Sequence, residues 1–382
     1  MKPRLSTRAE QSLNSISPVR QIMSYADSNY IRSLGIDAGN LISYAGGWVN
    51  HRAPEELRAA YQRIANDPAA FHAAGAYPHT LGNREFKEAV IAFESHVYGM
   101  RGLSVDQIAV GVGSTQLARN VFEILLNPGD AVLMLDPSYC NYPTQLTASI
   151  PDVRLIQFPV LDPDTWAYTP DERIPALCRV IAEQRPKVVM LISPDNPTGQ
   201  VLSHAFVSAV RDAVADVGGV LVMDFAYKEL VFNDAYPEYF AWGPSDNFVA
   251  LRSNSKWCRG LGRRLGWIEA PEFIVTAMES AQNSTILAPD MLHQLAMTAY
   301  VAAAIDAGTL RTYLAATNVL YQTAAARMMS AIERHLGLPA LTPAGVFDPP
   351  ARQRLPHLID GVTEAPEIFG ESSADVEEVT LE

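Results

Sequence analysis

Short runs of apolar residues, without regular polar alternation, recur through the middle of this 382-residue chain. A strand buried on both faces of a sheet shows such a continuous run, whereas a half-exposed strand alternates apolar with polar residues. The runs occupy residues 108–112, 131–135, 153–158, 188–192, 220–223, 248–251 and 265–268. Each run therefore predicts an interior strand.

Helix-like stretches separate several of these runs. They lie at residues 115–126, 175–183 and 205–217. Strands that alternate with helices predict an α/β fold, in which a mostly parallel sheet is covered by helices on both faces. Ligands bind such sheets at the carboxyl ends of the strands.

The flanking regions show helical patterns instead of strands. Helices are expected at residues 54–66, 83–98, 273–282, 289–305 and 310–336, and residues 6–22 fit either a helix or an extended arm. We therefore predict three regions. These are an N-terminal arm that joins the small domain (1–45), a large domain (46–285) and an abbreviated C-terminal small domain (286–382).

Charge and cysteine content narrow the classes of function. The 42 acidic residues exceed the 29 basic ones, giving a net charge of −13, which disfavours nucleic-acid binding and docking on an anionic membrane. The three cysteines show no metal-ligand spacing, which favours a reducing compartment and no metal site. With no secretory signal or membrane-spanning run, we expect a cytoplasmic protein that acts on small molecules.

Ser114 and Thr115 follow Gly113 between a predicted strand and a predicted helix. A helix start offers unpaired N–H groups and the positive end of a dipole, and so binds phosphate readily. A serine there also serves as a simple N-cap. This segment alone leaves both interpretations open.

Lys256 lies in the segment Ser253-Asn254-Ser255-Lys256, and Arg264 follows eight residues later. A lysine amine can hold an aldehyde cofactor as a Schiff base. The neighbouring hydroxyls and the arginine are suited to binding a phosphate. Most lysines are solvated surface charges, so the interpretation depends on the motifs that precede this one.

Four upstream residues are suited to a flat heterocyclic ring. A buried Asp224 at the end of a strand needs a partner, and a protonated pyridine nitrogen would serve. Tyr227 and Asn196 can bond to a ring oxygen, and Tyr139 can stack on the ring. Taken singly, these residues also fit a helix cap, a turn or core aromatics.

Taken together, the motifs resemble those of fold-type I pyridoxal-phosphate enzymes of the class I and II aminotransferase family. They read Ser-Pro-x-Asn-Pro-Thr-Gly at 193–199, Asp-x-Ala-Tyr at 224–227, and Ser-x-Ser-Lys with Gly-x-Arg-x-Gly-Trp within 253–267. The resemblance runs from about residue 42 to 267, and more loosely to 341. It implies a seven-stranded sheet in the large domain and a small α+β domain built from both terminal segments.

The resemblance also implies a role for each motif residue. Lys256 would bind pyridoxal 5′-phosphate as an internal aldimine and then move the proton of the substrate α-carbon, through an α-carbanion or quinonoid. Asp224 would pair with the ring nitrogen, Asn196 and Tyr227 would contact the ring oxygen, and Tyr139 would stack on the ring. The phosphate would be held by Gly113, Ser114, Thr115, Ser253, Ser255 and Arg264.

Two further segments carry implied contacts. Tyr77 resembles the family tyrosine that reaches a phosphate across the dimer interface, which implies a homodimer with shared active sites. Gly47 and Trp48 resemble the glycine-rich strand that passes over the substrate. With Asn196, they are expected to bind an amino acid.

One expected residue has no counterpart. The family pattern ends with an arginine that clamps the substrate carboxylate, but residues 371–382 contain no basic residue and Thr380 stands near the expected position. Arg20, Arg352 and Arg354 are the alternative candidates. We therefore predict an aminotransferase. The alternative is a lyase, a replacement enzyme or a carbon–carbon bond-forming synthase of a specialised biosynthetic pathway.

Two other classes fit less well. A non-catalytic, ligand-sensing regulator would carry a DNA-binding helix-turn-helix or a basic patch, and neither is recognisable in the chain. A nicotinamide-binding enzyme would show Gly-x-Gly-x-x-Gly after the first strand of its sheet, whereas Gly111-Val112-Gly113 continues into Ser114 and Thr115.

Overall fold

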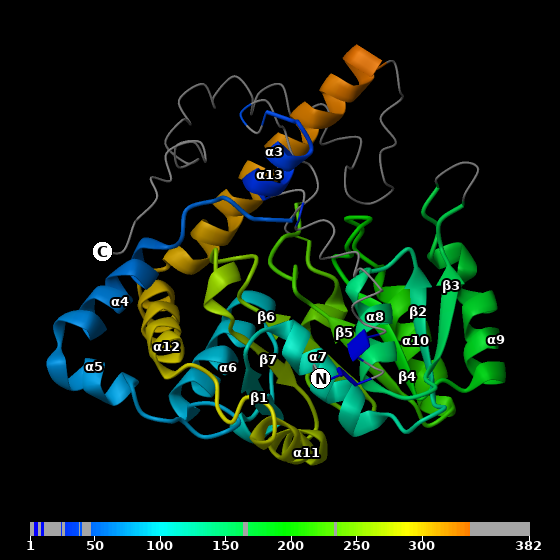
Figure 1. The fold of residues 1–382 in the computed structure, drawn as a ribbon, viewed down its shortest axis with the longest axis horizontal. Helices are drawn as coiled ribbons and strands as arrows, with labels where there is room; N and C mark the ends of the chain where they lie inside the picture. Colours follow the sequence, from blue (N-terminus) through cyan, green and yellow to red (C-terminus); the bar gives the residue numbers. More distant parts are fainter. Residues whose placement is uncertain are drawn as a thin grey trace.

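The computed structural model describes residues 4–6, 9–10, 24, 27–37, 39, 47–162, 167–232 and 235–336. Within these residues one seven-stranded sheet organises the molecule, with the order β1-β7-β6-β5-β4-β2-β3 (Figure 1). Its strands are β1 (Ile108–Gly111), β2 (Ala131–Asp136), β3 (Arg154–Pro159), β4 (Val188–Ile192), β5 (Val220–Asp224), β6 (Phe248–Ser253) and β7 (Gly266–Glu269).

The predicted α/β fold is confirmed. Strands β2 to β6 pair in parallel, and only β7 runs antiparallel to its neighbours β1 and β6. Every predicted apolar run is a strand, to within two residues at each end. The domain boundaries stay predictions. Most of residues 6–22 and all of residues 337–382 lie outside the described part of the chain.

Helices lie on both faces of the sheet and beyond its β1 edge (Figure 1). They are α3 (Ser28–Ser33), α4 (Glu55–Asn66), α5 (Pro68–Ala74), α6 (Arg84–Tyr98), α7 (Ser114–Leu125), α8 (Asn141–Ser149), α9 (Ile174–Gln184), α10 (His204–Asp216), α11 (Glu272–Asn283), α12 (Met291–Asp306) and α13 (Thr309–Leu336). Figure 1 shows α13 extending away from the sheet.

The continuous apolar runs arise because both faces of each central strand are covered. In β4, Val188 and Met190 pack on the face that carries α7, α8 and α11. Val189 and Leu191 point to the opposite face, which carries α9 and α10. A two-residue side-chain period with helices on both sides therefore favours apolar residues at successive positions of the strand.

A separate apolar cluster joins α4, α6, α12 and the start of α13 to the β1–β7 end of the sheet. Phe86 of α6 meets Trp267 of β7 edge to face, with ring centroids 5.9 Å apart. Local signals set the bounds of α6. Asn83 caps its start by accepting from the N–H groups of Glu85 and Phe86, and Gly99 ends it at φ 72°.

Three of the described helices, α3, α5 and α8, were not predicted from the sequence. Asp67 caps α5 and Pro68 fills its first turn, a strong start signal on a helix of only seven residues. Helix α8 begins directly after Cys140. From this region the sequence analysis assigned a role only to Tyr139, as a residue that can stack on a ring, and predicted no helix.

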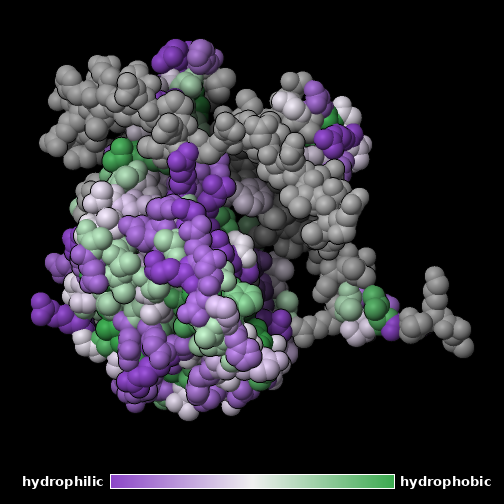
Figure 2. Space-filling model, turned by 90° about the vertical axis from the view of Figure 1, so that its left-hand side faces the viewer, coloured by the Kyte–Doolittle hydropathy of each residue, from purple (hydrophilic) through white to green (hydrophobic). Residues whose placement is uncertain are grey.

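Among the described helices, none combines the length and the apolar character required to cross a membrane. Figure 2 shows hydrophilic and hydrophobic residues interspersed over the visible surface.

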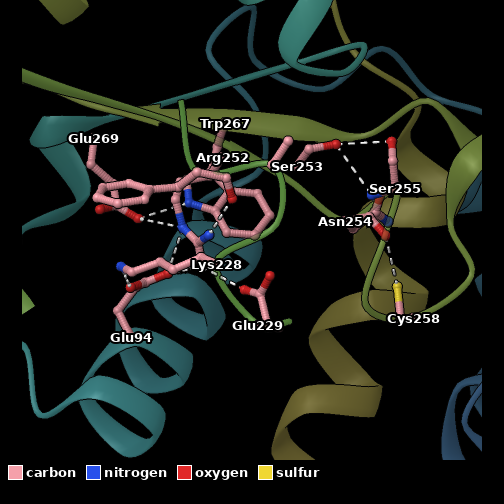
Figure 3. Close-up of polar contacts among 12 residues, drawn as sticks. Glu94, Lys228, Glu229, Arg252, Ser253, Asn254, Ser255, Cys258, Trp267 and Glu269 are labelled. Atoms are coloured by element: carbon pink, nitrogen blue, oxygen red, sulfur yellow. Dashed lines mark hydrogen bonds and ion pairs between the residues drawn. The ribbon is translucent and has the colours of Figure 1, made fainter. Parts of the chain in front are cut away.

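Five charged side chains are buried between α6 and the sheet, and we call them the buried ion network (Figure 3). Glu94 of α6 receives bonds from the Lys228 ammonium, at 2.7 Å, and from the Arg252 guanidinium. Arg252 also donates to Glu229 at 2.7 Å and lies 3.6 Å from Glu269. A buried charge without a partner is costly, so these groups satisfy one another.

The network sets the protonation of its acids. Burial opposes ionisation of Glu94, but the charges of Arg252 and Lys228 outweigh it and lower its pKa. Burial, helped by the negative charge of Glu94, raises the pKa of Glu269 to about 7. Three carboxyl groups face two cations, and burial raises the pKa of Glu229 as well as that of Glu269, which reaches about 7.

This protonation makes stability depend on pH. Glu269 keeps its proton in the folded protein up to about pH 7, against an ordinary pKa of 4.5. The stabilisation tied to the protonated form is therefore complete below about pH 4.5 and is lost as pH rises through 7. Glu269→Gln has no proton to lose. Relative to wild type, it should gain on the order of 2 kcal/mol in unfolding free energy between about pH 5 and 8.

Denaturant unfolding of both proteins at several pH values measures this difference. The exposed Glu183→Gln on α9 is the matched control and should track wild type throughout. A Glu269→Gln difference that stays constant with pH would contradict the assignment of the proton.

Candidate active site

A pocket of about 450 Å³ opens at the carboxyl ends of β4, β5 and β6. Ile192, Asp224 and Ser253, the last residues of these strands, all face it. Its remaining lining residues are Gly47, Trp48, Ser114, Thr115, Tyr139, Cys140, Tyr142, Asn196, Ala226, Tyr227, Ser255, Lys256, Leu261 and Arg264. The parallel strands therefore bring motifs far apart in sequence to one edge of the sheet, as expected.

Every predicted site residue except Gly113 and Tyr77 lines this pocket. Gly113 lies against the guanidinium of Arg264. The Tyr77 side chain lies outside the pocket and is 84% exposed. The substrate-carboxylate candidates Arg20, Arg352 and Arg354 lie outside the described residues. The roles assigned to all of the predicted site residues stay predictions.

The Lys256 amine points into the pocket and donates to the Gly47 carbonyl at 2.8 Å. Its nitrogen lies 5.3 Å from the centre of the Tyr227 ring. Burial lowers the pKa of this amine, the Arg264 charge lowers it further, and the Asp224 carboxylate opposes the shift. A lowered pKa increases the fraction of neutral amine, which is the form that attacks an aldehyde carbon.

Asp224 forms the floor of the pocket and is almost fully buried. It accepts hydrogen bonds from the Tyr142 hydroxyl and, at 2.8 Å, from the Ala226 N–H. Burial raises the pKa of Asp224, while these bonds and the charges of Arg252 and Lys256 favour the carboxylate. The pocket therefore contains a deep acceptor suited to a ring N–H.

Two further groups flank the same position. Burial raises the pKa of Tyr227 to about 12, although its hydrogen bond with Asn196 lowers the pKa somewhat. The hydroxyl therefore stays protonated and can donate to a ring oxygen. Tyr139 offers a flat face and is itself held edge to face by Tyr142, with centroids 5.3 Å apart. These groups suit a planar ring that carries an oxygen substituent.

A cluster of donors occupies the end of the pocket beside α7. Ser114 and Thr115 lie in the first turn of α7. The hydroxyls of Ser253 and Ser255, which also line this end of the pocket, are 2.9 Å apart. Arg264 supplies the positive charge. Four hydroxyls, a helix start and an arginine suit a phosphate dianion. With Lys256 and Asp224, the donor set fits pyridoxal phosphate.

Sequence reasoning did not assign a role to Tyr142. Its hydroxyl nevertheless donates a hydrogen bond to Asp224. The signal is that Tyr142 follows Tyr139 by three residues, in the first turn of α8, where the two rings meet edge to face. Cys140, Leu261 and Ile192 also line the pocket.

Buried histidines support the loop that carries Lys256. The His51 ring N–H donates to the Trp257 carbonyl at 3.0 Å, and its other nitrogen bonds to Tyr321 of α13 at 2.8 Å. Asn254 donates to His293 of α12. Burial lowers the pKa of His293 to about 3, so this ring remains a neutral acceptor. The lysine loop is thus attached to both C-terminal helices.

Comparison with known proteins gives one family for this chain. The family model described as aminotransferase class I and II matches residues 43–348. A probable aspartate/prephenate aminotransferase of Thermus aquaticus is 24% identical over 88% of this chain and 82% of its own length. A valine–pyruvate aminotransferase of Mycobacterium tuberculosis is 28% identical over 68% of this chain and 63% of its own length.

Solved structures agree in fold. The Thermus thermophilus aspartate aminotransferase crystallised with maleate superimposes with a TM-score of 0.73 at 22% identity. The match covers 91% of this chain and 84% of that one. A putative kynurenine aminotransferase of Saccharomyces cerevisiae gives the same TM-score at 18% identity, over 90% and 79% of the two chains.

The donor cluster depends on Gly113, which has φ 96°. A Cβ there would lie 2.5 Å from the Arg264 guanidinium. Gly113→Ala should therefore displace Arg264 and weaken pyridoxal-phosphate binding about tenfold, since one charge-assisted contact is worth roughly 1.5 kcal/mol or more. Quenching of tryptophan fluorescence by the added cofactor measures the dissociation constant.

Gly129→Ala is the matched control. Gly129 has φ 85°, so alanine is strained there too, but no atom lies within 4 Å of the added Cβ. It precedes β2, at the amino ends of the strands. Equal affinity losses in both variants would contradict a specific role for the Gly113 position.

Proposed function

The chain belongs to the class I and II aminotransferase family, and we propose that it transfers the amino group of an amino acid by means of pyridoxal phosphate. One observation carries the proposal. The Lys256 amine, the buried Asp224 carboxylate and the donor cluster around Arg264 converge on a single pocket. This set supplies a nucleophile, an acceptor for a ring N–H and a phosphate site.

When bound, pyridoxal phosphate supplies an electrophilic aldehyde carbon and a ring that withdraws electrons from the substrate α-carbon. Asp224 holds the proton of the ring nitrogen and thereby maintains this electron demand. Tyr227 and Asn196 bind the ring oxygen. The residues of the donor cluster anchor the phosphate, so the ring is fixed at both ends.

Lys256 has two tasks in this proposal. Its amine would hold the aldehyde carbon of the cofactor and, once the substrate amine has displaced it, would act as the base that moves the proton of the substrate α-carbon. The Gly47 carbonyl orients this amine at 2.8 Å. Trp48, 45% exposed at the pocket, lies where an incoming amino acid would contact it.

The test is a half-reaction without any keto acid. The purified protein, loaded with pyridoxal phosphate, is titrated with aspartate, valine, methionine and phenylalanine while its visible absorbance is followed. We expect one of these, or a related amino acid, to bleach the yellow cofactor to its amine form. Up to one equivalent of keto acid per site should be released, and an added keto acid should restore the colour.

Lys256→Ala is the control for this experiment. It should bind the cofactor through the phosphate and ring contacts, yet convert amino acid to keto acid at least about 10³-fold more slowly. Product formation with return of the yellow form, and without conversion of the cofactor to its amine form, would favour elimination, replacement or carbon–carbon bond formation. Full turnover by Lys256→Ala would contradict the assignment of the lysine.

We also propose a homodimer with shared sites. Tyr77 is 84% exposed and outside the pocket of its own chain, a position that suits a contact with the phosphate of a second copy. Light scattering should then give about twice the chain mass of 41.7 kDa. Tyr77→Phe should weaken cofactor binding several-fold, because one hydrogen bond to a charged group is lost.

Mixing two defective chains tests the sharing directly. A heterodimer of Tyr77→Phe with Lys256→Ala has one site with both Lys256 and the tyrosine of its neighbour intact. Mixing, unfolding and refolding the pair together should restore high-affinity turnover to part of the population. A monomeric mass, or a mixture no better than Tyr77→Phe alone, would contradict the proposal.

A further inference from the structure

Two chain segments carry most of the reactive groups in the pocket, and they lie side by side at the ends of β5 and β6. One holds Asp224 and Tyr227, and the other holds Ser253 and Lys256. The chemistry depends on how these segments sit relative to each other. Figure 3 shows that the buried ion network lies next to Ser253, where the lysine-bearing segment begins.

Arg252 bonds directly to the Asp224–Tyr227 turn. Its Nη1 donates to the Phe225 carbonyl at 3.1 Å, and its Nη2 donates to Glu229 at 2.7 Å. Phe225 follows Asp224 directly, so a side chain of the lysine-bearing strand holds the peptide next to the ring-binding carboxylate. A guanidinium presents its donors in a rigid plane, which suits such a link.

The other side of the same guanidinium is anchored on α6. Nε donates to Glu94 at 2.8 Å and Nη2 at 2.5 Å. Lys228 also bonds to Glu94, so the turn and the strand share one buried carboxylate. The guanidinium is therefore held by partners on two sides. It links α6 to the Asp224–Tyr227 turn and to the strand that leads to Lys256.

We propose that Arg252 is a positioning residue for the active site, which holds the Asp224–Tyr227 turn in register with the strand that carries Lys256. This inference rests on the proposed function, because the register matters only if one ligand contacts both segments. Arg252 lines no part of the pocket and acts through Asp224 and the lysine-bearing strand.

Charge adds to the geometry. Asp224 is buried, which disfavours its carboxylate, and the positive charge of Arg252 is among the groups that favour it. An arginine remains charged at every pH at which the protein is folded. Arg252 therefore contributes both to where Asp224 sits and to its ability to accept a ring N–H.

Stability alone gives a weak reason for these charges. Replacing a buried ion network by apolar residues of similar volume is often neutral or stabilising, because desolvation offsets the Coulomb attraction. The hydrogen bond from Arg252 to the Phe225 carbonyl ties this network to the turn that carries Asp224. The contacts of Arg252 with the turn account for the charge at this position.

Arg252→Lys tests the proposal while retaining the charge. A single ammonium cannot reproduce the planar fork to Glu94, Glu229 and the Phe225 carbonyl. The melting temperature is measured without cofactor and with saturating pyridoxal phosphate. The gap between the two values reports binding to the folded state. We expect Arg252→Lys to narrow this gap and to raise the cofactor dissociation constant about tenfold.

Glu269→Gln is the matched control, measured below pH 7, where Glu269 already holds its proton. It belongs to the same network, on β7, and none of its hydrogen bonds in the described structure reaches the Asp224–Tyr227 turn. It should keep the wild-type gap and the wild-type dissociation constant.

The outcomes separate three cases. If Arg252→Lys lowers both melting temperatures equally and binds the cofactor as wild type does, Arg252 is structural and the inference is overturned. If wild type itself shows no gap with pyridoxal phosphate, the proposed function fails instead. If Arg252→Lys does not fold, the same melting-temperature gap is measured on Glu229→Gln, which weakens one hydrogen-bond partner of the guanidinium. A narrowed gap supports the inference and a wild-type gap overturns it.

Discussion

Five charged side chains lie in the interior of this protein, and their burial forces them to bond to one another. Glu94 and Arg252 are 158 residues apart in sequence, yet they share two hydrogen bonds. Through Lys228, Glu229 and Glu269, the same contacts join helix α6, the turn after β5 and strand β7. The cost of an unpaired buried charge favours this arrangement over packings that would separate the two cations from the carboxyl groups.

The active-site pocket lies beside this network. Parallel strands place their carboxyl ends at one edge, so loops that are distant in sequence contribute to a single cavity. The loops then need support against movement. Arg252 supports the turn that contains Asp224, while His51 and His293 hold the loop that contains Lys256. The reactive groups therefore rest on buried, fully bonded supports rather than on mobile surface loops.

The ionisation of the pocket follows from the same arrangement. Lys256 is half-buried beside Arg264, which favours its neutral amine, and Asp224 is buried beside positive charges, which favour its carboxylate. The pKa of Lys256 is thus lowered toward the neutral amine that attacks an aldehyde, whereas burial raises the pKa of Asp224 and the neighbouring positive charges limit that rise. Neither shift can be read from residue type, because each depends on neighbours brought close by folding.

The sequence by itself determined the strands, the order of the motifs and most of the residues that line the pocket. Apolar runs report burial on both faces of a sheet, and motif residues at strand ends must converge in a parallel sheet. Only the tertiary structure decided the partners. Tyr142 beside Asp224 and Arg252 beside the Phe225 carbonyl are contacts between separate segments. Local spacing cannot encode such contacts, because they depend on how strands and helices pack in space.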